Sequence, residues 1–334
     1  MKVKIGDLTN IKTGKLDANA SSEDGQYPFF TCSREPLKIS TYSYDCECVL
    51  VAGNGDLNVK YYKGKFDAYQ RTYIMEDNGS GKLYIPYLYY FMEAYIDELR
   101  KQAIGGVIKY IKLGNIADAM IELPSIDNQK FIVDILGKVK EILDKRNAEI
   151  SALDALIKAR FVEMFGDCGN MVSMNDLCLI ITDGTHQPPK FQETGIPFIL
   201  VSNLSNNTVT YNTEKYISDE TYNELYKRTP IEQGDLLLST VGSYGHPAVV
   251  TENIKFLFQR HIAYLKPRRE LVNSFYLHGA LLAPDGQRQI EEKVKGIAQK
   301  TLNLSDIRKI MIPLPKLEEQ NAFADFVKQV DKSK

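Results

Sequence analysis

The strongest constraint on how this chain folds is an internal repeat. The clearest match joins Ile121-Glu-Leu-Pro-Ser-Ile-Asp-Asn-Gln129 to Ile312-Pro-Leu-Pro-Lys-Leu-Glu-Glu-Gln320, which lies 191 residues further on. Weaker matches keep the same order: Asp7-Leu8 with Asp176-Leu177, Gln70-Arg71 with Gln259-Arg260, Gly105 with Gly296, and Tyr110–Ile116 with Thr301–Ile307. A shared order of matches predicts two diverged copies of one domain.

Each copy has the pattern of a mixed α/β domain. Short runs rich in β-branched and aromatic residues, bounded by Gly and Asn, predict strands. They cover 47–52, 58–62 and 71–75 in the first copy, and 198–201, 235–240, 248–251 and 262–265 in the second. One helix is expected in each copy, over 87–102 and 274–295. The fold class is therefore α/β (mixed α+β), with two tandem domains.

A long helix is predicted between the copies, from about Asn128 to Phe165. Alternating spacings of four and three select ten positions, of which eight are apolar and two are Arg146 and Arg160. The apolar positions are Ile132, Leu136, Val139, Leu143, Ile150, Leu153, Ile157 and Met164. This spacing is typical of a coiled-coil seam, and the helix would be about 57 Å long. A seam of that length needs a partner helix.

The second copy begins the same helix. The equivalent seam positions are Phe323, Val327 and Val330, and the sequence ends at Lys334. We therefore expect domains at 1–124 and 167–315, a spacer helix at 125–166 and a shortened second helix at 316–334. The seam beyond Arg146 is expected to lack an intramolecular partner, so a partner subunit or the same helix of a second copy should cover it. The isolated chain is therefore expected to self-associate or to be poorly soluble.

Two diverged domains, each followed by a helix entered through Leu-Pro, resemble the specificity subunit of Type I restriction–modification systems. Asp183-Gly-Thr-His-Gln-Pro188 resembles the loop that opens many target-recognition domains in this family, although the first copy lacks it around Lys12–Asp17. The resemblance implies two target-recognition domains, each reading one half of a split site in double-stranded DNA. The helices would set the distance between the halves.

The same resemblance implies partners and cofactors. Two methyltransferase subunits would dock on the helices, and a restriction or translocase subunit would join where the system has one. S-adenosylmethionine and ATP with Mg²⁺ would then belong to those partners. The chain itself is expected to be non-catalytic and to need no cofactor.

Composition sets weaker limits. The chain has 44% hydrophobic and 25% charged residues, a net charge of −2 and five cysteines in no pairing pattern. These values are typical of a globular protein in a reducing cytoplasm. No run approaches a membrane span, and the first ten residues lack the apolar core of a signal peptide. A net charge of −2 does not indicate DNA binding, so positive charge must be local.

Two loops of the second copy carry candidate DNA contacts. In the first loop these are Thr185, His186, Gln187 and Lys190, and in the second they are Ser243, Tyr244 and His246. Hydroxyl and amide side chains can read base edges, and lysine can hold a phosphate. Ordinary turns explain both loops as well, with Asp183 and Thr185 capping backbone groups in the first. Gly53–Asp56 is the expected counterpart of the second loop.

Residues that are identical in both copies are expected to have the same structural or DNA-binding role in each copy. The Gln70-Arg71 and Gln259-Arg260 pairs can reach adenine and guanine, but domains reading different half-sites should differ in the residues that choose bases. A phosphate contact or a role in the fold is therefore the favoured interpretation of these pairs. Lys109 and Lys300 are candidate phosphate contacts, with a solvated lysine as the alternative.

Catalytic alternatives have less support. Asp285, Glu291 and Lys293 superficially fit a metal-dependent nuclease, but they lie on a charged helix and the first copy has no counterpart. Cys32, Cys46 and Cys48 lack the spacing of a structural zinc site, so no metal is expected. The chain has neither the methylase tetrapeptide nor an ATP-binding loop. A purely structural coiled-coil protein is the remaining alternative.

Overall fold

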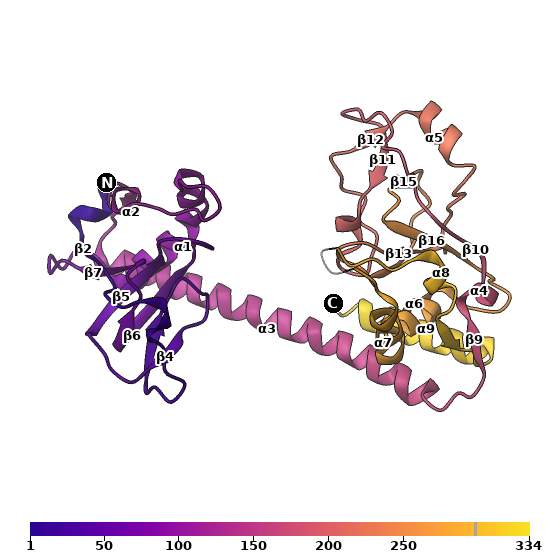
Figure 1. Cartoon of the computed structure of the whole chain (residues 1–334), viewed down its shortest axis with the longest axis horizontal. Helices are drawn as coiled ribbons and strands as arrows, with labels where there is room; N and C mark the ends of the chain where they lie inside the picture. Colours follow the sequence, from indigo (N-terminus) through magenta and orange to yellow (C-terminus); the bar gives the residue numbers. More distant parts are fainter. Residues whose placement is uncertain (297–298) are drawn as a thin grey trace. The chain divides into compact units, whose positions relative to one another are not determined.

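The structure is a computed structural model that describes residues 1–296 and 299–334 (Figure 1). It divides into two compact units, Met1–Lys145 and Arg146–Lys334. The helix α3, Ile126–Phe165, belongs partly to each unit, which agrees closely with the helix expected from the heptad pattern. Within the described part of the chain, no helix is both long and apolar enough to cross a membrane.

Unit 1 is built on a six-stranded sheet in the order β2-β7-β5-β6-β3-β4. These strands are β2 Thr9–Thr13, β3 Tyr27–Phe30, β4 Leu37–Ile39, β5 Tyr44–Ala52, β6 Val59–Ala68 and β7 Thr72–Asp77. The helix α1, Ile85–Gln102, packs Leu88, Met92 and Leu99 into a core shared with Val49 and Met75. The smaller elements are β1 Lys2–Lys4 paired with β8 Met120–Glu122, α2 Leu113–Ala117, and the 3-10 turns η1 Ile5–Asp7 and η2 Ala18–Ala20.

Unit 2 repeats this plan in three sheets. A four-stranded sheet has the order β10-β16-β13-β14, a three-stranded sheet the order β12-β11-β15, and β17 pairs with β9. The strands are β9 Met171–Ser173, β10 Cys178–Asp183, β11 Ile196–Ile199, β12 Tyr216–Ile217, β13 Leu236–Ser239, β14 Pro247–Val249, β15 Leu257–Phe258, β16 Ile262–Pro267 and β17 Met311–Pro313. The helices are α4 Met174–Leu177, α5 Asp219–Leu225, α6 Ser274–Leu282, α7 Pro284–Lys293, α8 Leu304–Ile307 and α9 Leu317–Asp331, with the 3-10 turn η3 Val201–Leu204.

The two glutamines of the sequence repeat form equivalent sets of hydrogen bonds in the two units. Gln129 donates to the carbonyl oxygens of Lys82 and Pro124 at 2.8 and 2.9 Å, and its Oε1 accepts from the Tyr84 amide at 2.8 Å. Gln320 donates likewise to Leu271 and Pro315 and accepts from the Asn273 amide. Both glutamines are fully buried. This shared set of bonds joins the start of α1 or α6 to the start of the following long helix, as expected of two copies of one domain.

The second long helix pairs with the far end of α3, and this corrects the expected unpaired seam. Phe323 of α9 packs against Phe161 and Phe165, and Lys334 forms an ion pair with Asp154 at 2.7 Å. The two helices run antiparallel, so the start of one meets the end of the other. Ile150, Leu153, Ile157 and Met164 are half-buried as a result, and the exposed seam positions are Leu136, Val139 and Leu143 in the first half of α3.

The single helix expected over 274–295 is two helices. Ala283 ends α6 in an extended conformation, with φ −64° and ψ 156°, and Pro284 begins α7. Proline disfavours the helical conformation of the residue before it, and it has no amide hydrogen for the preceding turn. Pro284 is instead accommodated in the first turn of a new helix.

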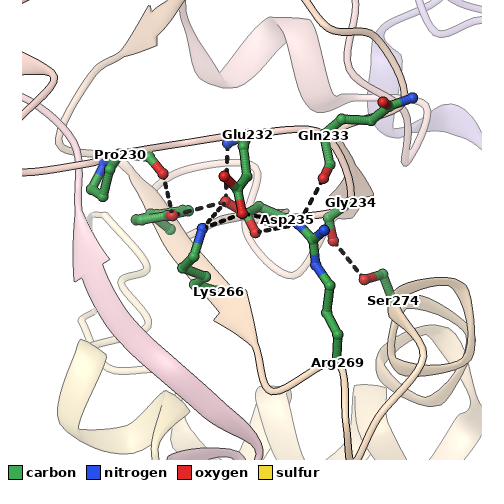
Figure 2. A network of polar contacts seen from close by, with 9 residues as sticks. Pro230, Glu232, Gln233, Gly234, Asp235, Lys266, Arg269 and Ser274 are labelled. Atoms are coloured by element: carbon green, nitrogen blue, oxygen red, sulfur yellow. Dashed lines mark hydrogen bonds and ion pairs between the residues drawn. The ribbon is translucent and has the colours of Figure 1, made fainter.

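A buried carboxylate organises the base of the four-stranded sheet in unit 2 (Figure 2). Asp235 is fully buried and accepts a hydrogen bond from the Tyr264 hydroxyl at 2.8 Å. It also lies 3.4 Å from Lys266 Nζ and 3.3 Å from Arg269 Nη2. Because charge buried without partners is costly, this network fixes β13 and β16 relative to the loop that precedes α6.

Candidate nucleic-acid interface

The first candidate loop of unit 2 follows β10 and is seated on the strand pair β15–β16 by backbone bonds. The Gly184 amide donates to Ile262 O at 3.2 Å, and the Thr185 amide donates to Phe258 O at 3.0 Å. The Arg260 amide donates to Thr185 O at 3.1 Å. A Cβ on Gly184 would collide with the carbonyl oxygens of Phe258 and Gln259. Glycine is therefore required here because two backbones approach closely.

The loop lines two hollows on the surface of unit 2. One, of about 440 Å³, lies between Thr185–Lys190 and the segment from α5 to Arg228. The other, of about 390 Å³, lies between the same loop, Lys215 and the turn that contains Gln259 and Arg260. The structure thus brings together six of the sequence candidates: Thr185, His186, Gln187, Lys190, Gln259 and Arg260.

Two residues that the sequence did not single out belong to this cluster. Arg228 forms an ion pair with Asp183, which also lies 2.8 Å from His186 Nε2. Arg260 Nε donates to His261 Nε2 at 3.2 Å. Burial and the neighbouring Arg260 charge lower the pKa of His261, which favours the neutral acceptor form of its ring. No motif marks Arg228, because it lies 45 residues away from Asp183 in the sequence and meets the loop only in the folded chain.

The second candidate loop meets Lys300. The Gly242 amide donates to Lys300 O at 3.1 Å, and Lys300 Nζ lies 3.5 Å from the Tyr244 hydroxyl. Ser243 is exposed beside them. The neighbouring residues Val241 and Thr301 line a hollow of about 320 Å³ together with Arg260 and Asp183. His246 differs: it is half-buried, and its Nδ1 lies 3.0 Å from Asn207 Oδ1, so the ring is engaged inside the unit.

Unit 1 has the same two loop positions with other side chains. Gly14 contacts the Ala68 and Tyr69 carbonyls as Gly184 contacts those of Phe258 and Gln259. The Gly55 amide donates to Lys109 O at 3.0 Å, as Gly242 donates to Lys300 O. Gly53–Asp56 is thus the counterpart of the second loop, and Lys109 is the counterpart of Lys300. The first loop of unit 1 contains Leu16 where unit 2 has Thr185, after one extra residue, Lys15.

The match of Gln70-Arg71 with Gln259-Arg260 is wrong by one position. The Thr72 amide bonds to Tyr69 O as the Ile262 amide bonds to Gln259 O, which makes Tyr69 the counterpart of Gln259. The Gln70 amide bonds to Leu16 O as the Arg260 amide bonds to Thr185 O. Gln70 therefore corresponds to Arg260, and Arg71 corresponds to His261. The Gln-Arg dipeptides of the two units therefore do not occupy equivalent positions, and every aligned pair of residues in this turn differs between the units.

The structure gives no support to the nuclease and metal alternatives. Asp285 bonds to Arg288 and Gln289 on its own helix α7. No group of three metal-binding side chains occurs in the described ranges 1–296 and 299–334. Burial raises the pKa of the Cys46 thiol to about 11 and raises that of Cys48 as well, so both side chains are neutral thiols near pH 7.

Comparison with known proteins agrees with this architecture. The family model described as the Type I restriction modification DNA specificity domain matches residues 1–152 and again 170–334. The chain is 37% identical over 156 residues to the specificity subunit of the Type I restriction enzyme EcoDI from Escherichia coli, covering 47% of this chain and 34% of that one. It is 23% identical over 276 residues to the EcoBI specificity subunit of the same organism, covering 73% and 58%. The chain thus spans about a third and somewhat over half of these two relatives.

A solved structure shows the same fold. The S subunit of a Type-I restriction-modification system from M. genitalium aligns with 100% of this chain and 89% of its own, with a TM-score of 0.59 and 15% identity. The expected fold class, a mixed α/β chain with two similar domains and long helices, is confirmed.

Proposed function

The chain belongs to the family of Type I restriction modification DNA specificity domains, and from this premise we propose that it recognises a bipartite DNA sequence for a methyltransferase complex. Each unit reads one half of the site. Its own surfaces bind DNA and partner subunits, and methyl transfer takes place on those partners. S-adenosylmethionine, and ATP with Mg²⁺ where cleavage occurs, are bound there and not by this chain.

The observation that carries the proposal is the equivalence of the two units at the candidate loops. Both units hold a glycine against a strand end, a second glycine loop against a lysine, and a buried glutamine at the start of a long helix. The side chains that the loops present differ. A common scaffold with different exposed side chains is what two readers of different half-sites require.

Local charge supports DNA as the ligand in spite of the overall net charge of −2. Lys190 and Lys215 line the two hollows beside the first loop of unit 2, and Arg260 lies in the turn that borders one of them. Lys300 lies at the second loop. Contacts between cations and phosphates give DNA affinity, and they need only a positive patch of this kind.

The proposal is tested by the DNA methylation of cells that contain the partner methyltransferase. With this chain present, methylome sequencing should reveal one motif made of two short halves separated by a fixed gap. With the chain omitted, that motif should be unmethylated. Methylation of the same sites in both strains, or methylation without a split motif, would contradict the proposed role.

A further inference from the structure

We propose that two equivalent turn positions choose bases within each half-site: Gln70 and Arg71 do so in unit 1, and Arg260, oriented by the half-buried His261, does so in unit 2. The inference rests on the proposed function, which it deepens by assigning specificity residues. It also reverses the interpretation based on the apparent Gln-Arg repeat. Once the register is corrected, the two units have different residues at both positions.

The backbone of this turn is fixed without help from its side chains. In unit 1 the Gln70 amide donates to Leu16 O at 2.9 Å, and Arg71 O accepts from the Gly53 amide at 2.7 Å. In unit 2 the Arg260 amide donates to Thr185 O at 3.1 Å, and His261 O accepts from the Thr240 amide at 2.9 Å. The main chain thus binds both candidate loops, and the side chains can change without loss of these bonds.

The side chains themselves are available to a ligand. Gln70, Arg71 and Arg260 are exposed, whereas the strand residues Thr72 and Ile262 that follow the turns are buried. Within the described residues, the side chains of Gln70 and Arg71 form no hydrogen bond or ion pair. Among residues 1–296 and 299–334, the one partner of the Arg260 guanidinium is His261 Nε2, which it contacts through Nε, so the two terminal nitrogens have no partner there and can act as a fork. A guanidinium fork matches guanine, and a carboxamide matches adenine.

Other positions show what a shared role looks like in this chain. Gln129 and Gln320 are identical, fully buried and make the same three bonds, as residues that hold the fold should. Lys109 and Lys300 are identical at equivalent places, as expected of contacts to a phosphate backbone that is the same in every sequence. The turn positions differ between the units, and Gln70, Arg71 and Arg260 are exposed there while His261 is half-buried. That combination is expected of side chains that distinguish bases.

His261 acts in this scheme as a positioning residue for Arg260. Its neutral ring accepts the Nε–H of Arg260, so the guanidinium plane is oriented while its outer edge stays free. In unit 1 the same position is occupied by Arg71, whose guanidinium is exposed and can itself serve as a fork for a base. The two units would therefore read with different residues of the same turn.

The test transplants the unit 1 pair into unit 2. The full chain carrying Arg260→Gln with His261→Arg is used to select from a library of duplex DNA with random sequence, beside the wild-type chain. We expect a changed base preference in one half of the selected motif, with the other half unchanged. The discrimination at the affected base pair should change roughly 5- to 150-fold. Arg260→Lys keeps the positive charge but removes the fork, and it should also relax that base.

The outcomes separate the inference from the proposed function. If the wild-type chain selects no motif, the proposed function fails. The inference is overturned if both variants select the same motif as the wild type. It is also overturned if the variants weaken binding to all sequences equally, because the turn then contacts phosphate and not bases. Circular dichroism establishes that the variants are folded, and Lys300→Ala is the control for uniform weakening. If the double variant does not fold, the base preference selected by Arg260→Lys alone tests the inference.

Discussion

Replacing Gly184 with alanine should weaken the backbone contacts that hold the first candidate loop of unit 2 against β15 and β16. A Cβ at this position would collide with the backbone oxygens of Phe258 and Gln259, which no side-chain movement can relieve. The loop must therefore shift, at the expense of the three backbone bonds made by Gly184, Thr185 and Arg260. At about 0.5–1.5 kcal/mol for each bond, seating would weaken by roughly 1.5–4.5 kcal/mol.

Hydrogen exchange with mass spectrometry measures this effect directly. A loss of about 1.5 kcal/mol or more should speed exchange of the Thr185 and Arg260 amides roughly 10-fold or more. Peptides of unit 1 should be unaffected. Selection from random duplex DNA should in addition lose discrimination in one half of the motif. Gly14→Ala is the equivalent change in unit 1, where the Ala68 and Tyr69 oxygens stand in the way.

Gly169 provides the matched control, because a Cβ there would meet nothing within 4 Å. Gly169→Ala should leave both exchange and base selection unchanged. The reasoning would be refuted if Gly184→Ala kept wild-type protection at Thr185 and wild-type selectivity. In that case the loop would tolerate a side chain at its closest approach to β15.

Three further predictions concern stability, affinity and association. Asp235→Ala should destabilise unit 2 by roughly 1–3 kcal/mol, because the Tyr264 hydroxyl and Lys266 lose a buried acceptor while Glu232 still pairs with Lys266 and Arg269. Thermal unfolding should show a lowered transition, and unchanged protection of β16 in hydrogen exchange would be inconsistent with the network. Lys109→Ala and Lys300→Ala should each weaken binding to all DNA sequences and lower the slope of log affinity against log salt by about 1; an altered motif would contradict a phosphate role. The first half of α3 exposes a row of apolar side chains, which predicts self-association; they are Ile135, Leu136, Val139, Ile142 and Leu143. Light scattering should show a smaller species for the variant with Ile135→Glu and Ile142→Glu. A wild-type chain that is monomeric at all micromolar concentrations would count against this prediction.

The long-range organisation could be predicted because it is encoded in periodicity and repetition. The heptad spacing from Ile132 to Met164 identified α3, and the Leu-Pro-x₄-Gln repeat identified the two units. The Leu-Pro-x₄-Gln repeat works because Gln129 and Gln320 each make the same buried bonds, so neither can change freely. Residues that hold the fold leave a signature that one sequence can reveal.

The candidate site was harder to predict because its geometry depends on register and on contacts distant in sequence. The repeated Gln-Arg letters suggested an equivalence that the backbone bonds of Thr72 and Ile262 shift by one residue. Arg228 and His261 joined the cluster only through the folded loops. The heptad pattern gave the seam of each helix but not the direction of pairing, so the exposed half of α3 was assigned to the wrong end.

The central claim, that each unit reads one half of a split site, is tested most directly by exchanging one unit. Residues 172–311 would be replaced by the equivalent segment of a relative with a different methylated motif, and the methylome of cells carrying the hybrid and its methyltransferase would be sequenced. We predict that one half of the motif changes to that of the donor while the other half stays as in the wild type. A change in both halves, or in neither, would contradict the account.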